Sequence, residues 1–234
     1  ITALGVAFFS GLRATAPDMR TTAENYFKNL NFMDIRLIST VGFNDDDVSA
    51  IKSVSGLKGV MPGYSADAAV RYNNQNYNVK LESLNLNQSA SNNSYINRPK
   101  VTEGRMPQNQ HECLADTKFM KFINCKIGDK VTFNSGSSKD INDILKFDTF
   151  TIVGIAENPL YISYGRGTSS IGNGTTDAYF FIPSDAFSLS VYTDIYVVAD
   201  NPKHYPIFSD NYDNKVLKPL KDTLSKISEK RKDI

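Results

Sequence analysis

Histidine, cysteine and tryptophan are scarce in this 234-residue sequence, which has two, two and none of them. His111 and His204 lie in polar or proline-flanked stretches with no nucleophile motif beside them. The Gly-x-Ser-x-Gly, His-Glu-x-x-His and Walker A patterns are absent, and no spacing of His, Cys, Asp and Glu resembles a zinc site. The sequence therefore predicts no catalytic residue, no metal site and no cofactor, and we expect a protein that is not an enzyme.

An excess of charge of either sign is also missing. The 26 Lys and Arg residues nearly balance 25 Asp and Glu residues, which leaves a formal net charge of +1. A protein that binds nucleic acid usually carries a clear basic excess, because the phosphate backbone dominates the affinity. We therefore expect no nucleic-acid partner.

Long hydrophobic runs are missing as well. The apolar run that opens the chain spans roughly a dozen residues, whereas a membrane-spanning helix needs about 20. Three interpretations of this run stay open on the residues alone: the outer end of a truncated membrane helix, the remnant of a signal peptide, or a buried core helix. Because the chain opens with Ile1 instead of Met, we expect it to be a piece of a longer protein.

The two cysteines, Cys113 and Cys125, follow no metal-binding spacing. A disulfide between them would be allowed outside the cytoplasm. We favour two free, buried thiols, because a free cysteine behaves as a small core hydrophobe. Cys113 is predicted in a strand and Cys125 just after a short helix over residues 117–123.

Two helices are predicted in the first quarter of the chain. Residues 15–18, Thr-Ala-Pro-Asp, favour a helix start because a hydroxyl cap, a first-turn proline and an acid follow one another. Its apolar face would hold Met19, Ala23, Tyr26, Phe27 and Leu30. The second helix starts after Asn44, and its three acids, Asp45 to Asp47, are interpreted as dipole-stabilising capping groups and not as a metal or catalytic cluster.

A third long helix is predicted from about residue 211 to the end. Leu217, Leu220, Leu224 and Ile227 step along it by three, four and three residues, which is the spacing of an a/d seam. Two heptads allow two interpretations. The helix lies on the domain through this face, or it continues into a coiled coil or a second membrane helix.

Short strands dominate the rest of the sequence, and the fold class they indicate is α+β. They alternate in polarity or lie between turn residues, as in the predicted hairpin of 66–72 and 77–84. Residues 13–92 and 188–234 are predicted to form one discontinuous α/β subdomain, and 93–187 a β-rich subdomain inserted into it. The predicted strands cover residues 32–40, 58–62, 66–72, 77–84, 112–115, 130–133, 147–156, 177–183 and 193–199.

A glycine-rich stretch over residues 159–176 is the most unusual part of the sequence. It contains Gly165-Arg166-Gly167, but a strand and not a helix follows, so a dinucleotide-binding interpretation fails. A long ordered loop is often functional. We therefore interpret the stretch as a contact for a partner, with a purely structural turn-rich loop as the alternative. The residues predicted for the contact are Tyr161, Ser163, Arg166, Ser169, Ile171 and Asn173.

Three passages together resemble the FtsX-like permease family, in its MacB-like periplasmic core domain. Residues 1–23 are similar to the end of the first membrane helix running into an external helix. Residues 103–107, Glu-Gly-Arg-Met-Pro, resemble a Gly-Arg-x-Pro turn that precedes a strand and a Lys-Ile-Gly-Asp turn, here 126–129. Residues 161–163 and 166–174 resemble a loop of Gram-positive members, with 179–183 following. No single motif is specific, so the resemblance depends on their order and spacing.

The resemblance implies two lobes, a porter-like subdomain over 13–92 and 188–234 and a sabre-like insertion over 93–187, with residues 1–12 ending a truncated transmembrane helix. It implies a domain on the extracellular face of the cell membrane and a cytoplasmic ATP-binding subunit on a separate chain. It further implies contact with the membrane through flanking helices, an extracellular protein or peptide partner, and a homodimer in the full transporter.

In such a permease the domain would couple cytoplasmic ATP hydrolysis to extracellular events through two helices. We expect these helices to pack side by side through Met19 and Phe27 on one and Leu217, Leu220, Leu224 and Ile227 on the other. The alternatives are a secreted binding or adhesion module without a transport role, and an extracellular hydrolase with a convergent acid pair.

Overall fold

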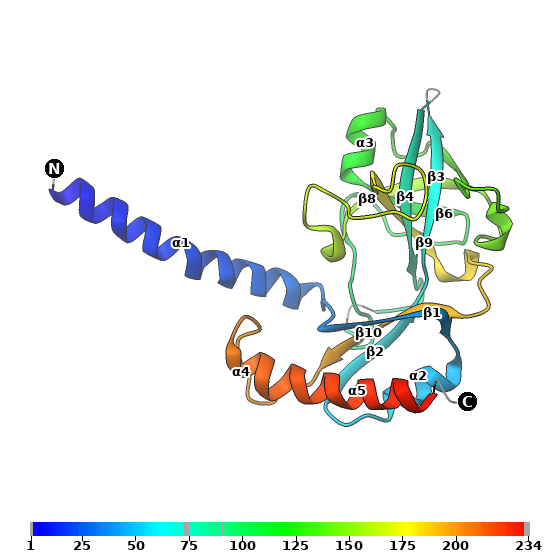
Figure 1. Cartoon of the computed structure of the whole chain (residues 1–234). Helices are drawn as coiled ribbons and strands as arrows, with labels where there is room; N and C mark the ends of the chain where they lie inside the picture. Colours follow the sequence, from blue (N-terminus) through cyan, green and yellow to red (C-terminus); the bar gives the residue numbers. More distant parts are fainter. Residues whose placement is uncertain (1, 73–74, 90, 232–234) are drawn as a thin grey trace.

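Two separate β-sheets make up most of this computed structural model, and a long helix projects from them (Figure 1). The structure describes residues 2–72, 75–89 and 91–231. The smaller sheet has three antiparallel strands in the order β1 (Ile35–Phe43), β10 (Tyr192–Ala199) and β2 (Leu57–Gly63). Together with the helices, the sheets confirm the predicted α+β class.

The larger sheet has seven strands and closes on itself. Because β7 pairs with both β3 and β8, six of the strands form a ring, and β5 pairs outside it along β8. We call this ring the barrel. In sheet order the strands are β5 (Lys100–Gly104), β8 (Thr149–Glu157), β6 (Glu112–Asp116), β9 (Ala178–Pro183), β4 (Gln75–Leu84), β3 (Ser65–Tyr72) and β7 (Lys130–Asn134).

Apolar side chains from all sides fill the barrel. Phe180 is fully buried, and its ring meets those of Phe119 and Phe133 at centroid distances of 4.8 and 5.1 Å in edge-to-face arrangements. Phe119 belongs to α3 (Thr117–Ile123), the short helix predicted from the sequence. Its Met120 and Ile123 join the same core. The apolar face of α3 therefore covers one part of the barrel.

The smaller sheet packs against helices on one face. Helix α2 (Asp45–Lys52) starts at Asn44, whose side chain and that of Asp47 form a capping box, as the sequence predicts for this acidic segment. Helix α5 (Lys218–Arg231) follows α4 (Asp210–Tyr212) and a π-helical turn over Asp213–Leu217. Leu220 and Leu224 of α5 are buried against this sheet together with residues of α2. The predicted leucine seam thus lies on the domain itself.

Helix α1 (Thr2–Asn29) runs continuously through Pro17. The predicted start at Thr15 is therefore wrong, because the capping pattern there lies inside a longer helix. Pro17 cannot donate the backbone hydrogen bond of its turn, and its own carbonyl accepts one from the Thr21 hydroxyl at 3.0 Å. Within residues 2–72, 75–89 and 91–231, a helix with the length and apolar content of a membrane span is not found.

The predicted hairpin is confirmed, and it belongs to the barrel. Strands β3 and β4 pair in register from Ser65↔Glu82 to Tyr72↔Gln75, while the predicted turn residues 73–74 lie outside the described residues. Beyond this hairpin, β4 pairs in parallel with β9 and β3 pairs with β7. By strand pairing, residues 65–84 thus join strands of the predicted insertion, although they fall within the predicted range 13–92. The division into subdomains itself stays a prediction.

Both cysteines are free thiols, as favoured from the sequence. Cys113 lies on β6 and is fully buried, and this burial raises the pKa of its thiol well above the ordinary value. Cys125 follows α3 and is partly buried. Cys113 therefore packs as a core residue.

Candidate functional site

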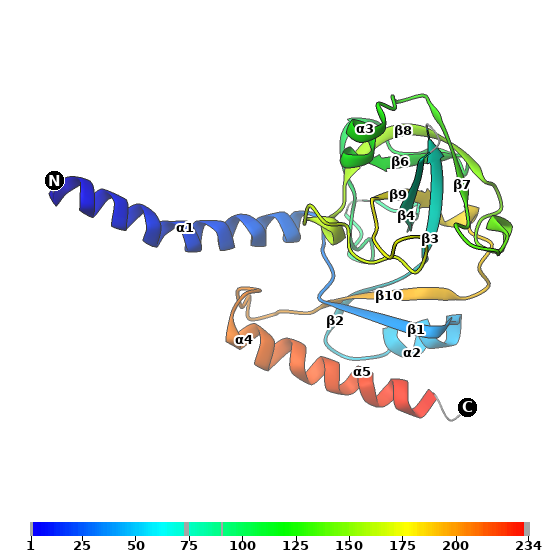
Figure 2. The ribbon, with the colours of Figure 1, turned by 45° about the horizontal axis from the view of Figure 1, so that its top comes forward.

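The glycine-rich stretch singled out in the sequence connects β8 to β9 and lies across the outside of the barrel (Figures 1 and 2). We call residues 158–176 the strap. It begins with Asn158, whose side chain accepts a hydrogen bond from the Leu160 amide at 2.9 Å and starts a single 3-10 turn over Pro159–Tyr161. Some strap residues hold the strap on the barrel, and others face outward.

Arg166 holds the strap to α3. Its Nε and Nη2 donate to the two oxygens of Asp116 at 2.8 and 2.9 Å, and its Nη1 donates to the carbonyls of Tyr161 and Ser163 at 2.6 Å each. Asp116 is fully buried and also accepts from the Lys118 amide as the N-cap of α3. The pair therefore fixes the strap relative to α3, and the Arg166 guanidinium forms its hydrogen bonds within the chain.

Tyr161 ties the strap to the junction of the two sheets. Its ring stacks on that of Tyr179 with centroids 4.9 Å apart, and its hydroxyl donates to Glu82 Oε1 at 2.6 Å. Glu82, on β4, also accepts from Ser65 at 3.2 Å and from the Tyr196 hydroxyl of β10 at 3.3 Å. Its carboxyl is only 3% exposed, and burial raises its pKa, while the Tyr161 hydrogen bond opposes that rise.

A second ion pair continues from this junction into the smaller sheet. Arg36 of β1 lies 5.9 Å from the ring centroid of Tyr196, and its Nε donates to Asp194 of β10 at 2.6 Å. Two residues before Arg36, Asp34 accepts hydrogen bonds from the Ala199 amide at 2.8 Å and from the Tyr212 hydroxyl of α4 at 2.6 Å. Polar contacts therefore run from the strap through Glu82 into β1 and β10, next to the end of α1 and to α4.

The second half of the strap is also held by the barrel. Asn173 Oδ1 accepts from Asn78 Nδ2 at 2.9 Å, and Ser169 donates its amide to the Gly174 carbonyl at 3.0 Å. The side chain of Ile171 lies so close to Gly136 that a Cβ there would be 2.5 Å from Ile171 Cδ1. Asn173 and Ile171 thus contact residues outside the strap and Ser169 contacts the strap itself, while the role of all three in binding a partner stays a prediction.

The outward part of the strap contains residues that the sequence analysis did not single out. Tyr164 and Ile162 are 76% and 66% exposed, and Phe122 of α3 is 64% exposed. Lys118 lies between the two rings, its Nζ 4.7 Å from the Tyr164 centroid and 5.7 Å from that of Phe122. We call Lys118, Phe122, Ile162 and Tyr164 the aromatic patch. Helical spacing could have revealed Phe122, because Phe119, Met120 and Ile123 already occupy the inner face of α3.

The two helices predicted to transmit motion do not lie side by side. Helix α1 extends away from the sheets, whereas α5 lies along the smaller sheet (Figures 1 and 2). Met19 is 67% exposed, and the Phe27 ring meets those of Phe32 and Phe208 at 4.7 and 6.4 Å. Leu217, Leu220 and Leu224 pack on the sheet instead, and Ile227 is partly buried. The predicted leucine seam therefore packs on the smaller sheet and not on α1.

The Gly-Arg-x-Pro turn has a structural explanation. Gly104 has φ +76°, and a Cβ there would lie 2.3 Å from the Val153 carbonyl oxygen. Arg105 then donates to both oxygens of Glu112 at 2.7 and 2.8 Å, and this pair lowers the pKa of the Glu112 carboxyl to about 2.

Among the residues that the structure describes, no cluster of three or more His, Cys, Asp and Glu side chains is placed to hold a metal ion.

A comparison with models of protein families identifies one family. A model of the MacB-like periplasmic core domain matches residues 1–211. The extracellular domain of the noncanonic ABC-type transporter YknZ from Gram-positive bacteria is similar at 13% identity and a TM-score of 0.45, over 70% of this chain and 77% of that one. The periplasmic region of MacB from Actinobacillus actinomycetemcomitans gives 13% and 0.42, over 82% and 75%. Among curated proteins no match is found. Both solved structures are remote, at 13% identity, whereas the family model matches residues 1–211.

Proposed function

Because this chain belongs to the MacB-like periplasmic core domain family, we propose that it is the extracytoplasmic domain of an ABC transporter permease and couples cytoplasmic ATP hydrolysis to an extracellular partner. In this proposal the domain itself performs no chemistry. A separate cytoplasmic subunit hydrolyses ATP, membrane helices flank the domain, and two copies work together in the full transporter. The domain receives motion from the membrane side and presents it at the barrel.

One observation carries the coupling part of the proposal. The Arg166–Asp116 pair, the Tyr161–Glu82–Tyr196 hydrogen bonds, the contact of Arg36 with the Tyr196 ring and the Arg36–Asp194 pair connect the strap to β1 and β10. Buried charge pairs and hydrogen bonds resist shear, because separating any one of them leaves a buried group without its partner. A displacement of β1 by α1 would therefore move the strap with it as one body.

The aromatic patch is the proposed docking surface, in place of the strap residues predicted from the sequence. Residues 117–123 and 159–176 contain Lys118, Lys121 and Arg166 but no Asp or Glu. Since Arg166 already pairs with Asp116, the two lysines remain as positive charge beside the exposed rings. Exposed aromatic side chains rimmed by cations fit an acidic protein segment with an apolar anchor residue. The Arg166–Asp116 pair holds the two halves of this surface together.

The coupling proposal can be tested by electron–electron distance measurements on the full-length permease with its ATP-binding subunit in lipid nanodiscs. One pair of spin labels, at Lys121 and Lys203 in a Cys125→Ser background, measures the distance between α3 and the loop after β10 within one domain. A second pair, at Lys121 of two copies, measures how one domain moves relative to the other. We expect ATP to change the second distance and leave the first unchanged. A changed internal distance would contradict the single-body proposal, and no change in either would contradict coupling.

Docking can be tested with a photo-crosslinking amino acid at Tyr164 of the full-length permease in its native host. We expect crosslinks to a protein segment rich in Asp and Glu, with their yield reduced by the charge reversal Lys118→Glu. The matched control carries the crosslinker at Lys139, an exposed position on another barrel loop. Crosslinks to lipid alone, or equal products from both positions, would contradict the proposal.

A further inference from the structure

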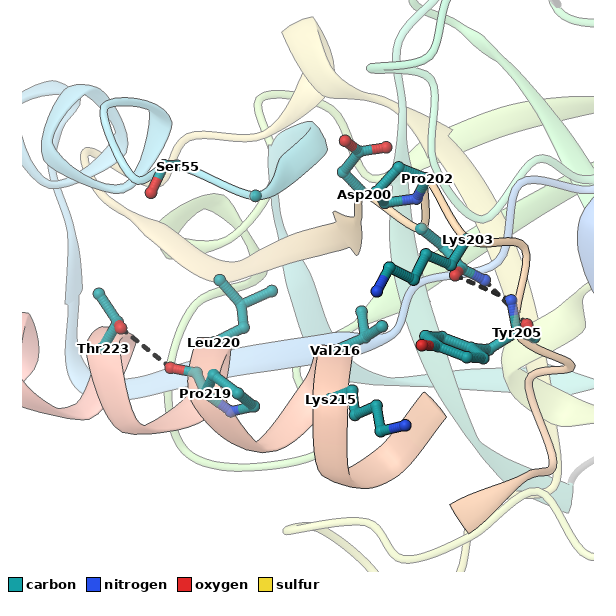
Figure 3. A pocket seen from close by; sticks show the side chains of 12 residues that line it. Ser55, Asp200, Pro202, Lys203, Tyr205, Lys215, Val216, Pro219, Leu220 and Thr223 are labelled. Atoms are coloured by element: carbon teal, nitrogen blue, oxygen red, sulfur yellow. Dashed lines mark hydrogen bonds between the residues drawn. The ribbon is translucent and has the colours of Figure 1, made fainter. Parts of the chain in front are cut away.

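A cavity of about 380 Å³ lies at the edge of the smaller sheet, far from the aromatic patch (Figure 3). The start of α5 forms its floor, residues 200–205 after β10 form one wall, and the turn at Ser55 and Gly56 before β2 forms another. A volume of this order is enough for a small ligand, since ligand pockets usually measure about 300–1,000 Å³. The cavity plays no part in the coupling described above.

Two lysines give the cavity a positive character. Lys203 extends its ammonium group toward Val216 and Leu220, whereas the Asp200 carboxylate points the other way in Figure 3. Lys215 lies with its Nζ 5.5 Å from the centroid of the Tyr205 ring. Among the residues that the structure describes, neither lysine has an acidic partner within ion-pair distance. Asp200 is the one acid among the described lining residues, so positive charge is in excess.

Apolar residues line the cavity beside the two lysines. Pro202, Val216, Pro219 and Leu220 line it, and Leu220 is 6% exposed because it also belongs to the core of the smaller sheet. Ser55, Tyr205 and Thr223 also line the cavity, and the Thr223 hydroxyl donates to the Pro219 carbonyl at 2.9 Å. Two ammonium groups beside valine, proline and leucine match a ligand that has a charged end and an apolar body.

The backbone on the floor of the cavity is unusual in a way that points to the same place. Residues Asp213–Leu217 form a π-helical turn between α4 and α5. Such turns are rare and occur frequently at functional sites, because they place side chains where a regular helix would not. Here the turn carries both Lys215 and Val216, one cationic and one apolar residue of the cavity lining.

We propose that this cavity binds an amphiphilic phosphate, with the oxyanion attracted by the Lys203 and Lys215 ammonium groups and the apolar part on Val216, Pro219 and Leu220. Lysine is a common phosphate ligand that acts as a point charge. The same chemistry has two sources, a soluble phosphate ester or the headgroup of an anionic lipid. The site does not depend on the transporter proposal, because it rests only on the cavity and its lining.

The test is a titration of this isotope-labelled chain, followed by amide chemical shifts, with hexyl phosphate, inorganic phosphate and hexanol. Hexyl phosphate should give saturable shifts at Gly56, Asn201 and Lys215, and bind more tightly than either other compound. The double variant Lys203→Ala/Lys215→Ala should bind about tenfold more weakly, because charge-assisted hydrogen bonds are lost. Lys221→Ala, an exposed lysine of the same helix, is the matched control and should bind as the parent does.

Sedimentation with phosphatidylglycerol vesicles separates the two sources. Binding to vesicles that the double variant loses assigns the headgroup, whereas binding to hexyl phosphate without vesicle binding assigns a soluble ester. The proposal is overturned if hexanol binds as well as hexyl phosphate, if no compound gives saturable shifts, or if Lys221→Ala weakens binding as much as the double variant does.

Discussion

The barrel and the smaller sheet of this chain solve the same packing problem in different ways. The barrel closes its sheet and encloses its own core, while the smaller sheet has two edge strands and depends on α2 and α5 for cover. On β1 the side chains of Ile38 and Val41 are 69% and 84% exposed. The barrel core is therefore enclosed by its own strands, whereas the core of the smaller sheet, from which α1 departs, depends on helices. Four predictions test this difference.

The largest effect is expected from Phe180→Ala in the barrel. Phe180 is fully buried and contacts two other rings, so its removal leaves a cavity in a core that cannot collapse around it. The free energy of unfolding should fall by about 3–5 kcal/mol. Chemical denaturation measures this, and hydrogen exchange should accelerate throughout the barrel strands. Exchange limited to α3 would show that the barrel does not act as one unit.

A somewhat smaller loss, about 3 kcal/mol, is expected from Leu224→Ala, because this side chain is buried between α5 and the smaller sheet. Hydrogen exchange should accelerate in α2, α5 and β1 while the barrel strands keep their protection. Lys221→Ala, exposed on the same helix, should change stability little. Equal loss of protection in both sheets would show that the two regions unfold together.

Arg166→Ala should lower stability by about 2 kcal/mol, less than a fully buried pair because the Arg166 side chain stays 12% exposed. The change leaves the buried Asp116 without its cation, so exchange should increase in the strap and at the start of α3. Arg105→Ala removes a similar bidentate pair with Glu112 at an exposed position and should have a much smaller effect. A larger effect from Arg105 would refute the assignment of Arg166 as the anchor.

The smallest effect concerns pH and the junction between the two regions. Burial raises the pKa of Glu82 above its ordinary value of 4.5, so the folded state binds this proton more tightly than the unfolded state. Stability should therefore fall as pH rises from 4.5 through the raised pKa, and Glu82→Gln should remove this slope.

Glu112 gives the opposite sign as a contrast to Glu82. Its pKa is lowered to about 2, so its contribution is present above 4.5 and lost as pH falls toward 2. Denaturation midpoints measured from pH 2 to 8 for both Glu→Gln variants separate the two. A parent protein whose stability does not fall above pH 4.5, or a Glu82→Gln variant that keeps the slope, would contradict the role of Glu82.

The sequence predicted most helices and strands, but it did not predict the aromatic patch. Asn44 and the acids after it predicted α2, and residues 117–123 predicted α3 because caps and periodicity are properties of neighbouring residues. Arg166 pairs with Asp116, 50 residues away, and nothing local in the sequence shows this pair. The partner contact predicted for Arg166 stays a prediction. Tyr164 and Phe122 escaped notice for the same reason, since exposure results from what else covers a surface.

By itself the sequence determined the α+β class, the order of most strands, the capped helices and the resemblance to the family, because each depends on spacing along the chain. The tertiary structure alone decided that β7 closes a barrel by pairing with β3 and β8, that α1 passes through Pro17, that the leucines of α5 face a sheet, and that Glu82 lies between the two regions. These features depend on pairs of residues far apart in sequence. Alternating apolar residues specify that a strand is half buried, but they do not specify the partner it packs against.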